Sequence, residues 1–246
     1  MSSSNARAES PKNSDEFAAR AAIKQVLAEF RQMKKEEVPF APNSTGTALK
    51  VVKAMREENL QLVMNKDHIG RIAGIKVGDT FDSRGEASLI GLHGPMMSGI
   101  NTVKPESVPG RDVIANSVAF SVGSGTTYPD NSYDESAGIL VFSGEGRNPP
   151  DANTSSSKKK PGTGKVKNRP QGYEDQKATA RNKALINSFQ ENIPIRVIRG
   201  DPSRMAHDEE KYTYEGFFEI EKYEQKKGLH NNQVYTFHMK RKEDQR

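Results

Sequence analysis

Short β-rich segments separated by glycines fill most of the chain from Gly74 onward. "DVIANSVAFSVGSG", "GILVFSG" and "IPIRVIRG" are rich in β-branched and aromatic residues and are predicted to be strands. "GILVFSG" is almost wholly apolar, which indicates a buried strand. "YEGFFEIEKYEQ" and "QVYTFHMKRK" flank "KKGLHNN", where Gly228 and Asn231 can adopt positive φ, so they are predicted to pair as a hairpin. "GIKVGDTFDSRGEASLIGLHG" is also expected to consist of short β-rich pieces.

Helical periodicity occurs in three other segments. In the first, Ser14 is a candidate N-cap, with Asp15 and Glu16 in the first turn. Its expected apolar face comprises Phe17, Ala21, Val26, Phe30 and Met33. "VPFAPNSTG" ends this helix, and a second helix is predicted from Thr47. The apolar side of the second helix comprises Leu49, Val52, Met55 and Leu60. The two helices are expected to pack as a hairpin.

The third helical segment, "DQKATARNKALINSFQ", interrupts the strands. Asp175 is its candidate cap, and Ala178, Leu185 and Phe189 are expected to face a core. The chain is therefore predicted to have an α+β fold. Residues 1–13 are expected to be a disordered tail, 14–65 a two-helix segment, and 66–242 the main domain with a flexible basic loop at 149–171.

The composition is polar for a fully packed chain. Hydrophobic residues make up 33% of the 246 residues, and the mean hydropathy is −0.80, so part of the chain is expected to be unstructured. The stretch 149–171 shows no periodicity and has one acid, and a loop of this length in a compact domain is functional or disordered. Its basic residues are Lys158, Lys159, Lys160, Lys165, Lys167 and Arg169. Neither a secretory signal nor a membrane-spanning helix is expected.

The sequence shows no recognisable pattern of catalytic or metal-binding residues. It has no Cys, which excludes disulfides and Cys-ligated zinc, and its five His lack the HExxH spacing. No nucleophile elbow or P-loop occurs. We therefore expect no catalytic residue, no metal and no cofactor. The net charge of +5, the basic loop, the aromatic residues and the glycine turns favour nucleic-acid binding.

An acidic segment lies at the centre of this basic chain. Residues 128–146 contain no Lys or Arg but four acids, Asp130, Asp134, Glu135 and Glu145. Tyr128 and Phe142 stand on either side of most of them. A basic chain thus keeps an acidic segment flanked by aromatic residues at its centre.

Four segments, in order, resemble the SRA (SET- and RING-associated, or SRA-YDG) domain family. "GIKVGDTF...LIGLHGPMMSGI" resembles a strand followed by a GxHxPxxxGI turn, matched by His93, Pro95, Gly99 and Ile100. "YDESAGILVFSGEG" resembles the block that ends in YTGxGG, and "DQKATARNKALINSFQENIPIRVIRG" resembles the DQ...NxAL block. In "YTYEGFFEIEKYEQKKG", Tyr214-Glu215-Gly216 replaces the YDG for which the family is named.

The two predicted helices resemble the segment before the SRA domain of plant-type histone methyltransferases. The catalytic SET domain of those proteins is not expected here, because the chain ends soon after the last strand. The resemblance implies a PUA-like curved β-barrel flanked by helices over 66–242, preceded by the helical hairpin. Tyr214 and Gly216 are expected to be structural.

The resemblance also implies a function. The chain is expected to be a non-catalytic reader of 5-methylcytosine or 5-hydroxymethylcytosine in duplex DNA, which flips the base into an aromatic pocket. Flipping costs a few kcal/mol, and stacking and polar contacts in a pocket recover this cost. The implied partner is double-stranded DNA carrying modified cytosine, with chromatin proteins as further candidates. A monomer and a nuclear location are expected.

Site residues follow from the same resemblance. Two aromatic side chains of the family sandwich the flipped base, and Tyr128 and Phe142 align with them. Phe142 replaces a Tyr but keeps the π-face needed for stacking. A carboxylate accepts from the cytosine N4 amino group, for which Asp130 is the first choice, Asp134 the second and Asn131 an alternative. Ser143 aligns with the Thr of YTG.

Two loops of the family probe the duplex. The first places Met97 near the gap left by the flipped base, which an apolar wedge can fill. The second is an NKR-like finger, for which Lys167, Asn168 and Arg169 are the candidates. Phosphate contacts are expected from Lys158, Lys159, Lys160 and Lys165.

Two other functions remain open at this point. Some SRA proteins are fused to nucleases, so the chain could be part of a modification-dependent nuclease. It could also be a non-specific nucleic-acid or protein-binding module whose pocket has drifted, as "TTY" and "FSG" differ from the family pattern. Cleavage with Mg²⁺, or equal affinity for methylated and unmethylated DNA, would distinguish these functions from a reader.

Overall fold

A computed structural model describes residues 11–37, 45–60, 68–104, 112–122, 130–146, 175–201, 211–228, 231–243 and 245. Its helices are α1 (Pro11–Glu37), α2 (Thr45–Glu57), α3 (Arg84–Leu89) and α4 (Ala180–Gln190). Its strands are β1 (Thr80–Phe81), β2 (Ile100–Val103), β3 (Ile114–Ser121), β4 (Ser132–Asp134), β5 (Ile139–Ser143), β6 (Ile195–Gly200), β7 (Tyr212–Lys227) and β8 (Gln233–Arg241).

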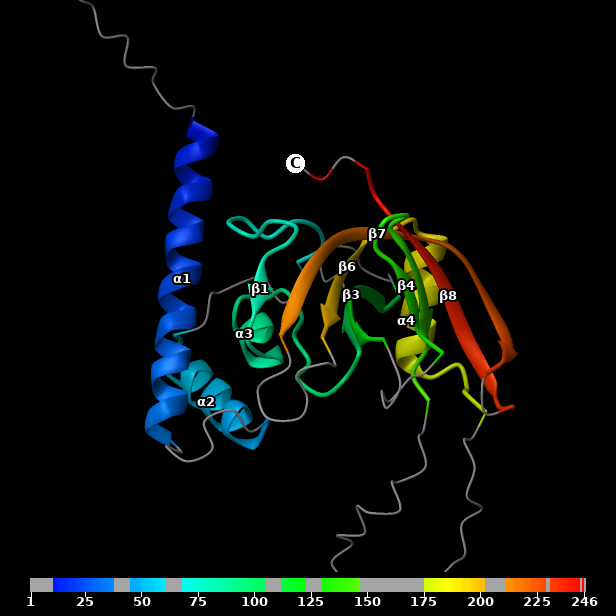
Figure 1. The fold of residues 1–246 in the computed structure, drawn as a ribbon, viewed down its shortest axis with the longest axis horizontal. Helices are drawn as coiled ribbons and strands as arrows, with labels where there is room; N and C mark the ends of the chain where they lie inside the picture. The colour runs from blue at the N-terminus through cyan, green and yellow to red at the C-terminus, as the bar shows by residue number, and fades with distance from the viewer. Residues whose placement is uncertain are drawn as a thin grey trace, which may run out of the picture.

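The strands form one curled sheet in the order β2-β3-β6-β7-β8-β5-β4, with β1 beside β7 (Figure 1). Among the described pairs, β3 and β6 run parallel and the others antiparallel. The curl brings β4 against β3, as the contact between two of their rings shows. The Tyr133 ring meets Phe120 edge-on, with centroids 5.5 Å apart. Asn131 Nδ2 also donates to the Ser121 carbonyl at 3.3 Å. The α+β fold with a curved, barrel-like sheet is confirmed.

Two irregularities bend the long strand β7, which arches over the sheet in Figure 1. Its pairing with β6 shifts at Glu215, and its pairing with β8 shifts at Glu221, so each residue is an extra one in its strand. Such bulges bend a strand and increase its twist. Gly216, beside the first bulge, has φ +98°, which glycine adopts without the strain that a side chain would add.

The main core lies between the sheet and α4. Phe218 and Phe237 are fully buried in it, together with Leu185 of α4. The strands predicted around β3, β5, β6, β7 and β8 are confirmed. In the β7–β8 turn, Asn231 has the predicted positive φ of 60°, whereas Gly228 does not.

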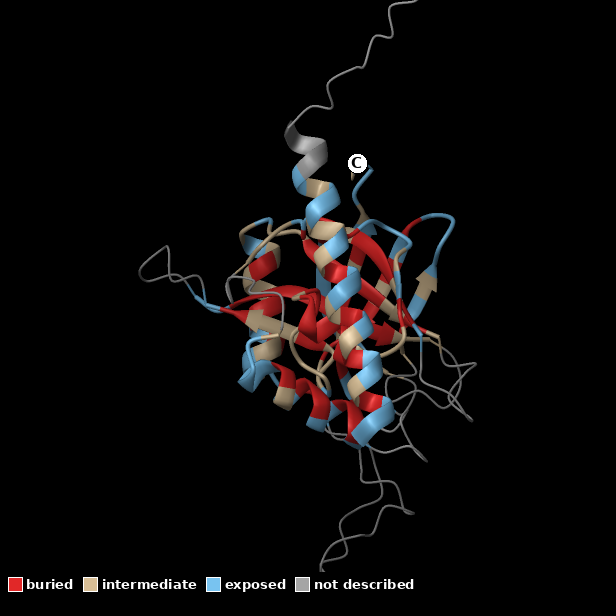
Figure 2. Cartoon of the chain, turned by 90° about the vertical axis from the view of Figure 1, so that its left-hand side faces the viewer, coloured by how far each residue is buried: buried red, intermediate tan, exposed pale blue. Residues whose placement is uncertain are grey.

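The helices α1 and α2 pair as predicted. Phe30 of α1 is buried with Val26 and Met33 packed beside it, as expected, but the rest of the buried face of α1 differs from the prediction. The helix begins at Pro11 rather than after Ser14, consistent with the preference of proline for the first helical turn. Phe17 and Ala21 are exposed, and the buried stripe comprises Ile23, Leu27, Phe30 and Lys34. Figure 2 looks onto α1 and shows exposed residues along much of its outer side.

The other helices differ from the prediction at their ends. α2 stops at Glu57, because Asn59 turns left-handed (φ 59°) and the Leu60 amide bonds the Met55 carbonyl at 2.8 Å. Leu49 is exposed. α4 is capped by Thr179, whose Oγ1 accepts from the Asn182 amide, whereas Asp175 accepts from the Gln233 amide at 2.6 Å.

Residues 84–89, predicted to be part of a β-rich stretch, form α3. Ser83 caps it by accepting from the Glu86 amide, and Glu86 Oε2 accepts from the Asp82 amide at 2.8 Å. Ser83 and Glu86 have the spacing of a capping box, a signal that could have identified this helix.

Candidate nucleic-acid interface

The loop of residues 94–98 is held at both ends and presents Met97 to solvent. Ser88 Oγ donates to the Gly94 carbonyl at 2.6 Å, and Arg84 donates to the Ser98 carbonyl at 2.8 Å. Between these anchors, Met97 is 74% exposed. A large apolar side chain on a fixed loop is suited to insertion into a gap in a partner.

His93 supports the same loop from inside the core. Its Nε2 lies 2.9 Å from the Ser98 carbonyl and its Nδ1 3.0 Å from Ser117 Oγ. A carbonyl only accepts, so Nε2 carries the proton and Nδ1 accepts from the Ser117 hydroxyl. Burial, together with the charge of Arg84, lowers the pKa of His93 to about 3. The imidazole is therefore neutral and acts as a fixed support.

Ser143 and Asn131 meet where β4 begins and β5 ends. The Ser143 amide donates to Asn131 Oδ1 at 2.7 Å, and both residues are buried. Asn131 also bonds the Ser121 carbonyl, so its amide group joins β3, β4 and β5. Asn131 thus has a positioning role at this site that its choice as an alternative base ligand did not include.

Gln176 and Asn182 fix the turn that follows β5. Gln176 Nε2 donates to Ser143 Oγ at 3.3 Å and to the Gly144 carbonyl at 2.8 Å. Asn182 bonds both the amide and the carbonyl of Glu145, at 2.8 and 2.9 Å. Sequence reasoning assigned no role to either residue, although both stand in the DQ...NxAL block.

The two glycines of "GEG" permit this close packing. A Cβ at Gly144 would lie 2.7 Å from Asn182 Oδ1, and one at Gly146 would lie 2.6 Å from Gln176 Cγ. Both distances are shorter than real Cβ contacts, so side chains at these positions would push the turn away from its supports.

Phe142 lies under the same region. Its side chain is 4% exposed and belongs to the main core, opposite Phe237 of β8. The tip of its ring faces Gly99, where a Cβ would lie 3.9 Å from Phe142 Cζ and 3.0 Å from the Ala119 carbonyl. The structure therefore brings Phe142 together with the end of the Met97 loop, with its ring covered.

The two candidate acids are separated. Asp130 lies beside Asn131, and its carboxylate lies close to Gly228, since a Cβ there would be 3.0 Å from Asp130 Oδ2. Asp134 lies at the other end of β4, about 10 Å from Asn131 at the usual rise per strand residue. There it accepts from Ser136 Oγ at 2.7 Å and from the Ala137 amide at 3.0 Å. These bonds, that of Ser136 first, lower the pKa of Asp134.

Several predicted site residues lie outside the described residues. They are Tyr128 of the pocket, Lys167, Asn168 and Arg169 of the finger, and Lys158, Lys159, Lys160 and Lys165 of the basic loop.

Glu215, in the position of the YDG acid, holds strands together away from this site. Its carboxylate accepts from Arg199 Nε and from an Arg241 nitrogen, each at 2.7 Å, and from the Tyr133 hydroxyl at 2.8 Å. The bulge in β7 turns Glu215 toward these partners, which come from β6, β8 and β4. The expectation that Tyr214 and Gly216 are structural agrees with this arrangement.

Within the described ranges, no group of three or more His, Asp or Glu residues is placed to hold a metal ion. None of the described helices is long and apolar enough to cross a membrane.

Comparison with known proteins identifies the family. Residues 68–245 match the SAD/SRA domain. The chain belongs to the SAD/SRA domain family. The family match begins after α2, so both α1 and α2 lie outside it.

The curated relatives are plant proteins. The H3 lysine-9 specific histone-lysine N-methyltransferase SUVH6 of Arabidopsis thaliana is 34% identical over 70% of this chain. A YDG domain-containing protein of the same plant is 30% identical over 80% of it. The chain spans 20% of the length of the first and 52% of the second.

Solved SRA structures share the fold. The SUVH5 SRA bound to fully hydroxymethylated CG DNA is 30% identical, with a TM-score of 0.54 over 73% of this chain and 97% of that one. The structure of KRYPTONITE in complex with mCHG DNA and SAH has a TM-score of 0.71 and 23% identity, over 94% of this chain and 44% of that one. That wider match extends the likeness in fold to the N-terminal helices.

Proposed function

We propose that this chain is a non-catalytic reader of modified cytosine in duplex DNA, acting in the nucleus as a monomer. The observation that carries the proposal is the match to nearly the whole SUVH5 SRA, whose structures contain hydroxymethylated, fully methylated and hemimethylated CG DNA. Identity of 28–30% over that domain supports a shared binding mode. Chromatin proteins are further candidate partners, since relatives are histone methyltransferases.

The base enters at the Ser143 end of the β4–β5 hairpin. Tyr128 supplies one stacking face and Phe142 the inner wall of the pocket, while Met97 fills the gap in the duplex. Asp130 is the acid that accepts from the N4 amino group, because it lies at this end and Asp134 serves the turn at the other. Asn131 and Ser143 fix the backbone around the base. The finger of Lys167, Asn168 and Arg169 contacts the duplex beside Met97.

The backbone of the DNA is held by cations. Lys158, Lys159, Lys160 and Lys165 supply phosphate contacts, which carry no sequence information but set the affinity and its salt dependence. An acid in the pocket would repel phosphate, but it bonds an amino group favourably. The basic loop thus binds the phosphates of the DNA, and the acidic segment binds the amino group of the flipped base.

Substitution of Tyr128 tests the pocket. Tyr128→Ala removes a stacking face, worth about 1–3 kcal/mol, so the ratio of affinities for methylated and unmethylated duplexes should fall toward one. Weak, salt-dependent binding should remain. Tyr128→Phe keeps the ring and should keep the ratio. If the ratio survives in Tyr128→Ala, the flipped base does not stack on this residue. Cleavage of modified DNA with Mg²⁺ would contradict the non-catalytic assignment.

A further inference from the structure

A cleft of about 940 Å³ lies between α2 and the SRA domain. It is lined by α2 and by the 94–98 loop that presents Met97. Glu145, from the turn after β5, and Arg181 of α4 complete it. The cleft therefore joins a helix outside the family domain to two elements of the proposed DNA site.

α2 is held rigidly against the domain. Val52 and Met55 of α2 share a core cluster with Leu89 of α3, and Met96 packs on it. Arg56 donates to Ser88 Oγ at 2.7 Å, one residue from the end of α3. The backbone of α2, which carries Lys50 and Lys53, is thus packed in place relative to the 94–98 loop.

The lining of the cleft has more cationic than anionic side chains, and part of it is apolar. Lys50, Lys53, Arg56 and Arg181 line the cleft, against two acids, Glu57 and Glu145. The side chains of Lys50 and Lys53 are 68% and 78% exposed, and their spacing places them on one side of α2. Their ion pairs with Glu37 and Glu57, at 3.1 and 3.8 Å, are exposed and of the weak kind that exchanges partners readily.

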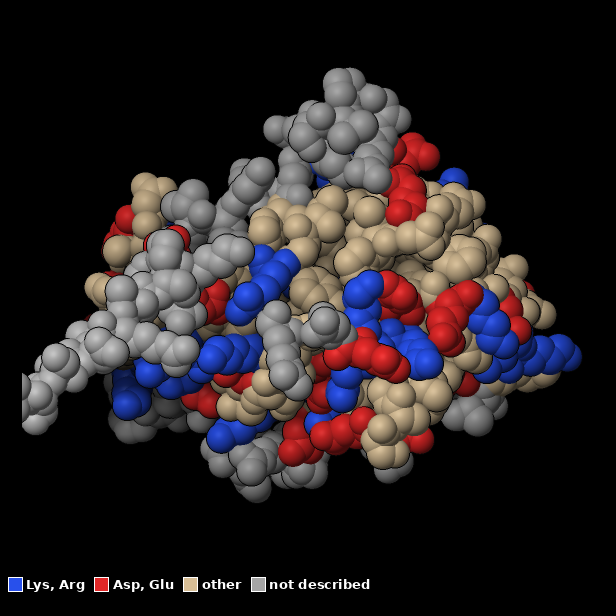
Figure 3. Space-filling model, turned by 90° about the horizontal axis from the view of Figure 1, so that it is seen from above, with Lys and Arg blue, Asp and Glu red and all other residues tan. Residues whose placement is uncertain are grey.

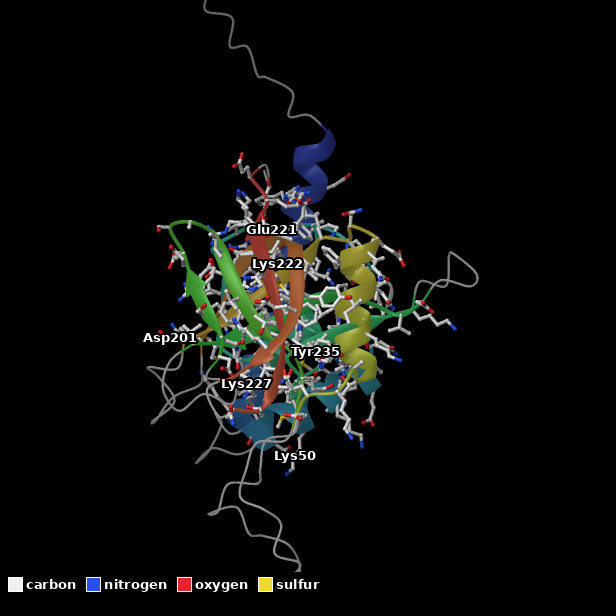
Figure 4. All side chains as sticks on the ribbon, turned by 90° about the vertical axis from the view of Figure 1, so that its right-hand side faces the viewer. Lys50, Asp201, Glu221, Lys222, Lys227 and Tyr235 are labelled. Carbon is white, nitrogen blue, oxygen red and sulfur yellow. The ribbon has the colours of Figure 1, made fainter. Side chains whose placement is uncertain are left out.

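A nucleic-acid strand alternates anionic phosphates with less polar sugars. Exposed ammonium groups suit the phosphates, and Leu49, Pro95 and Met96 offer apolar contact to the sugars. Met97, Lys50 and Lys53 line the same cleft, so a duplex that Met97 enters would have α2 beside its backbone. Figure 4 places Lys50 at the lower end of the molecule, on the same half as Lys227 and away from Glu221 and Lys222.

We propose that this cleft binds the phosphodiester backbone of the duplex next to the Met97 site, through Lys50 and Lys53 of α2. The inference rests on the proposed function and extends its DNA-binding surface beyond residues 68–245. An acidic peptide with apolar residues would meet the same walls. DNA is favoured because the cleft is continuous with the Met97 loop.

The test compares two double variants of the full chain. Lys50→Ala/Lys53→Ala removes two cleft cations, and Lys24→Ala/Lys222→Ala removes two exposed lysines that do not line the cleft. Affinity for a duplex with one 5-methylcytosine and for its unmethylated counterpart is measured over a range of salt concentrations. The cleft variant should flatten the salt slope by up to about 0.9 per lost phosphate contact, and the control should not.

The outcomes separate the two proposals. Both variants should keep the wild-type ratio of affinities for methylated and unmethylated DNA. If the cleft variant and the control have the same salt slope and affinity, α2 does not contact the backbone, whatever the ratio. A wild-type ratio of one contradicts the reader function instead. Circular dichroism spectra like the wild type, expected for exposed lysines, confirm that each variant is folded.

Discussion

At the scale of single residues, buried amide and imidazole side chains hold the backbone around the proposed pocket, and the acids of the segment 128–146 do less of this. Asn131, Gln176 and Asn182 bond the backbone of 143–145, and His93 bonds that of the Met97 loop. Each of these side chains is buried, where an unsatisfied polar group would cost about 1–3 kcal/mol. These bonds hold the backbone of 143–145 and of the 94–98 loop in the structure without DNA.

The neutral state of His93 makes stability depend on pH. Its pKa of about 3 in the folded chain is below the value near 6.5 expected on unfolding, so the unfolded chain binds a proton that the folded chain does not. Stability is then complete above about pH 6.5 and falls as pH drops toward 3. Between pH 7 and pH 5 this one group should account for a loss of about 2 kcal/mol.

A His93→Gln variant isolates this contribution. Urea unfolding at pH 7 and pH 5 should show a smaller pH dependence in the variant, by about the same 2 kcal/mol. The overall stability of the variant can differ at both pH values without affecting the comparison. Equal pH dependence in the two proteins would mean that His93 titrates normally in the folded state.

The sequence indicated which end of the hairpin some candidate site residues occupy, but not the positions of others. Phe142, Ser143 and Asp130 do gather at one end of the β4–β5 hairpin, and Asp134 does not. The sequence alone could not show that Asp130 and Asp134 lie at different ends of β4. The register of β4 on β5 places Asp134 at the turn. Thr179 rather than Asp175 caps α4, since Asp175 bonds a strand distant in sequence.

At the scale of elements, the bulge at Glu215 organises four strands. The Glu215 side chain is nearly fully buried, and its two arginine partners are less than a third exposed. An ion pair of this kind is costly to break from one side, because the remaining charges lose their partner. The bonds that Glu215 makes to Arg199 and Arg241 explain why an acid stands between Tyr214 and Gly216.

Glu215→Gln should therefore lower the free energy of unfolding by about 3 kcal/mol. Glu219→Gln, on the same strand, is the matched control, because its ion pair with Lys242 is exposed and should contribute less than about 1 kcal/mol. Urea titrations with unchanged slope provide the measurement. Similar losses in the two variants would show that the Glu215 network contributes no more than a surface pair.

Strands were predicted better than helices at this scale. The apolar runs of β3 and β6 suffice to identify buried strands, and "KKGLHNN" marks the β7–β8 turn. β5 was also expected to be buried, but Ile139 is exposed and Val141 is partly exposed. α3 was missed because glycines and β-branched residues surround it. Ile23 and Leu27 on the buried face of α1 were missed because their partners in the cluster, Tyr212 among them, are distant in the sequence.

At the scale of the whole molecule, the N-terminal helices and the SRA domain form one packed body. Ile23 and Leu27 of α1 share a cluster with Phe81 and Tyr214, and Arg31 bonds the buried Glu86 at 2.7 Å. The sequence predicts the helical hairpin but not this attachment, because the contacts join residues distant in the sequence, such as Arg31 and Glu86. Figure 3 shows basic and acidic side chains mixed on the upper face of the molecule.

The most direct test of the reader function compares three duplexes that differ at one cytosine, which is unmodified, 5-methylated or 5-hydroxymethylated. We expect the chain to bind at least one modified duplex about fourfold or more tightly than the unmodified one, since burying a single methyl group is worth about 0.8 kcal/mol. The ratio should persist as salt weakens all three affinities. Equal affinity for the three duplexes at every salt concentration would contradict the account.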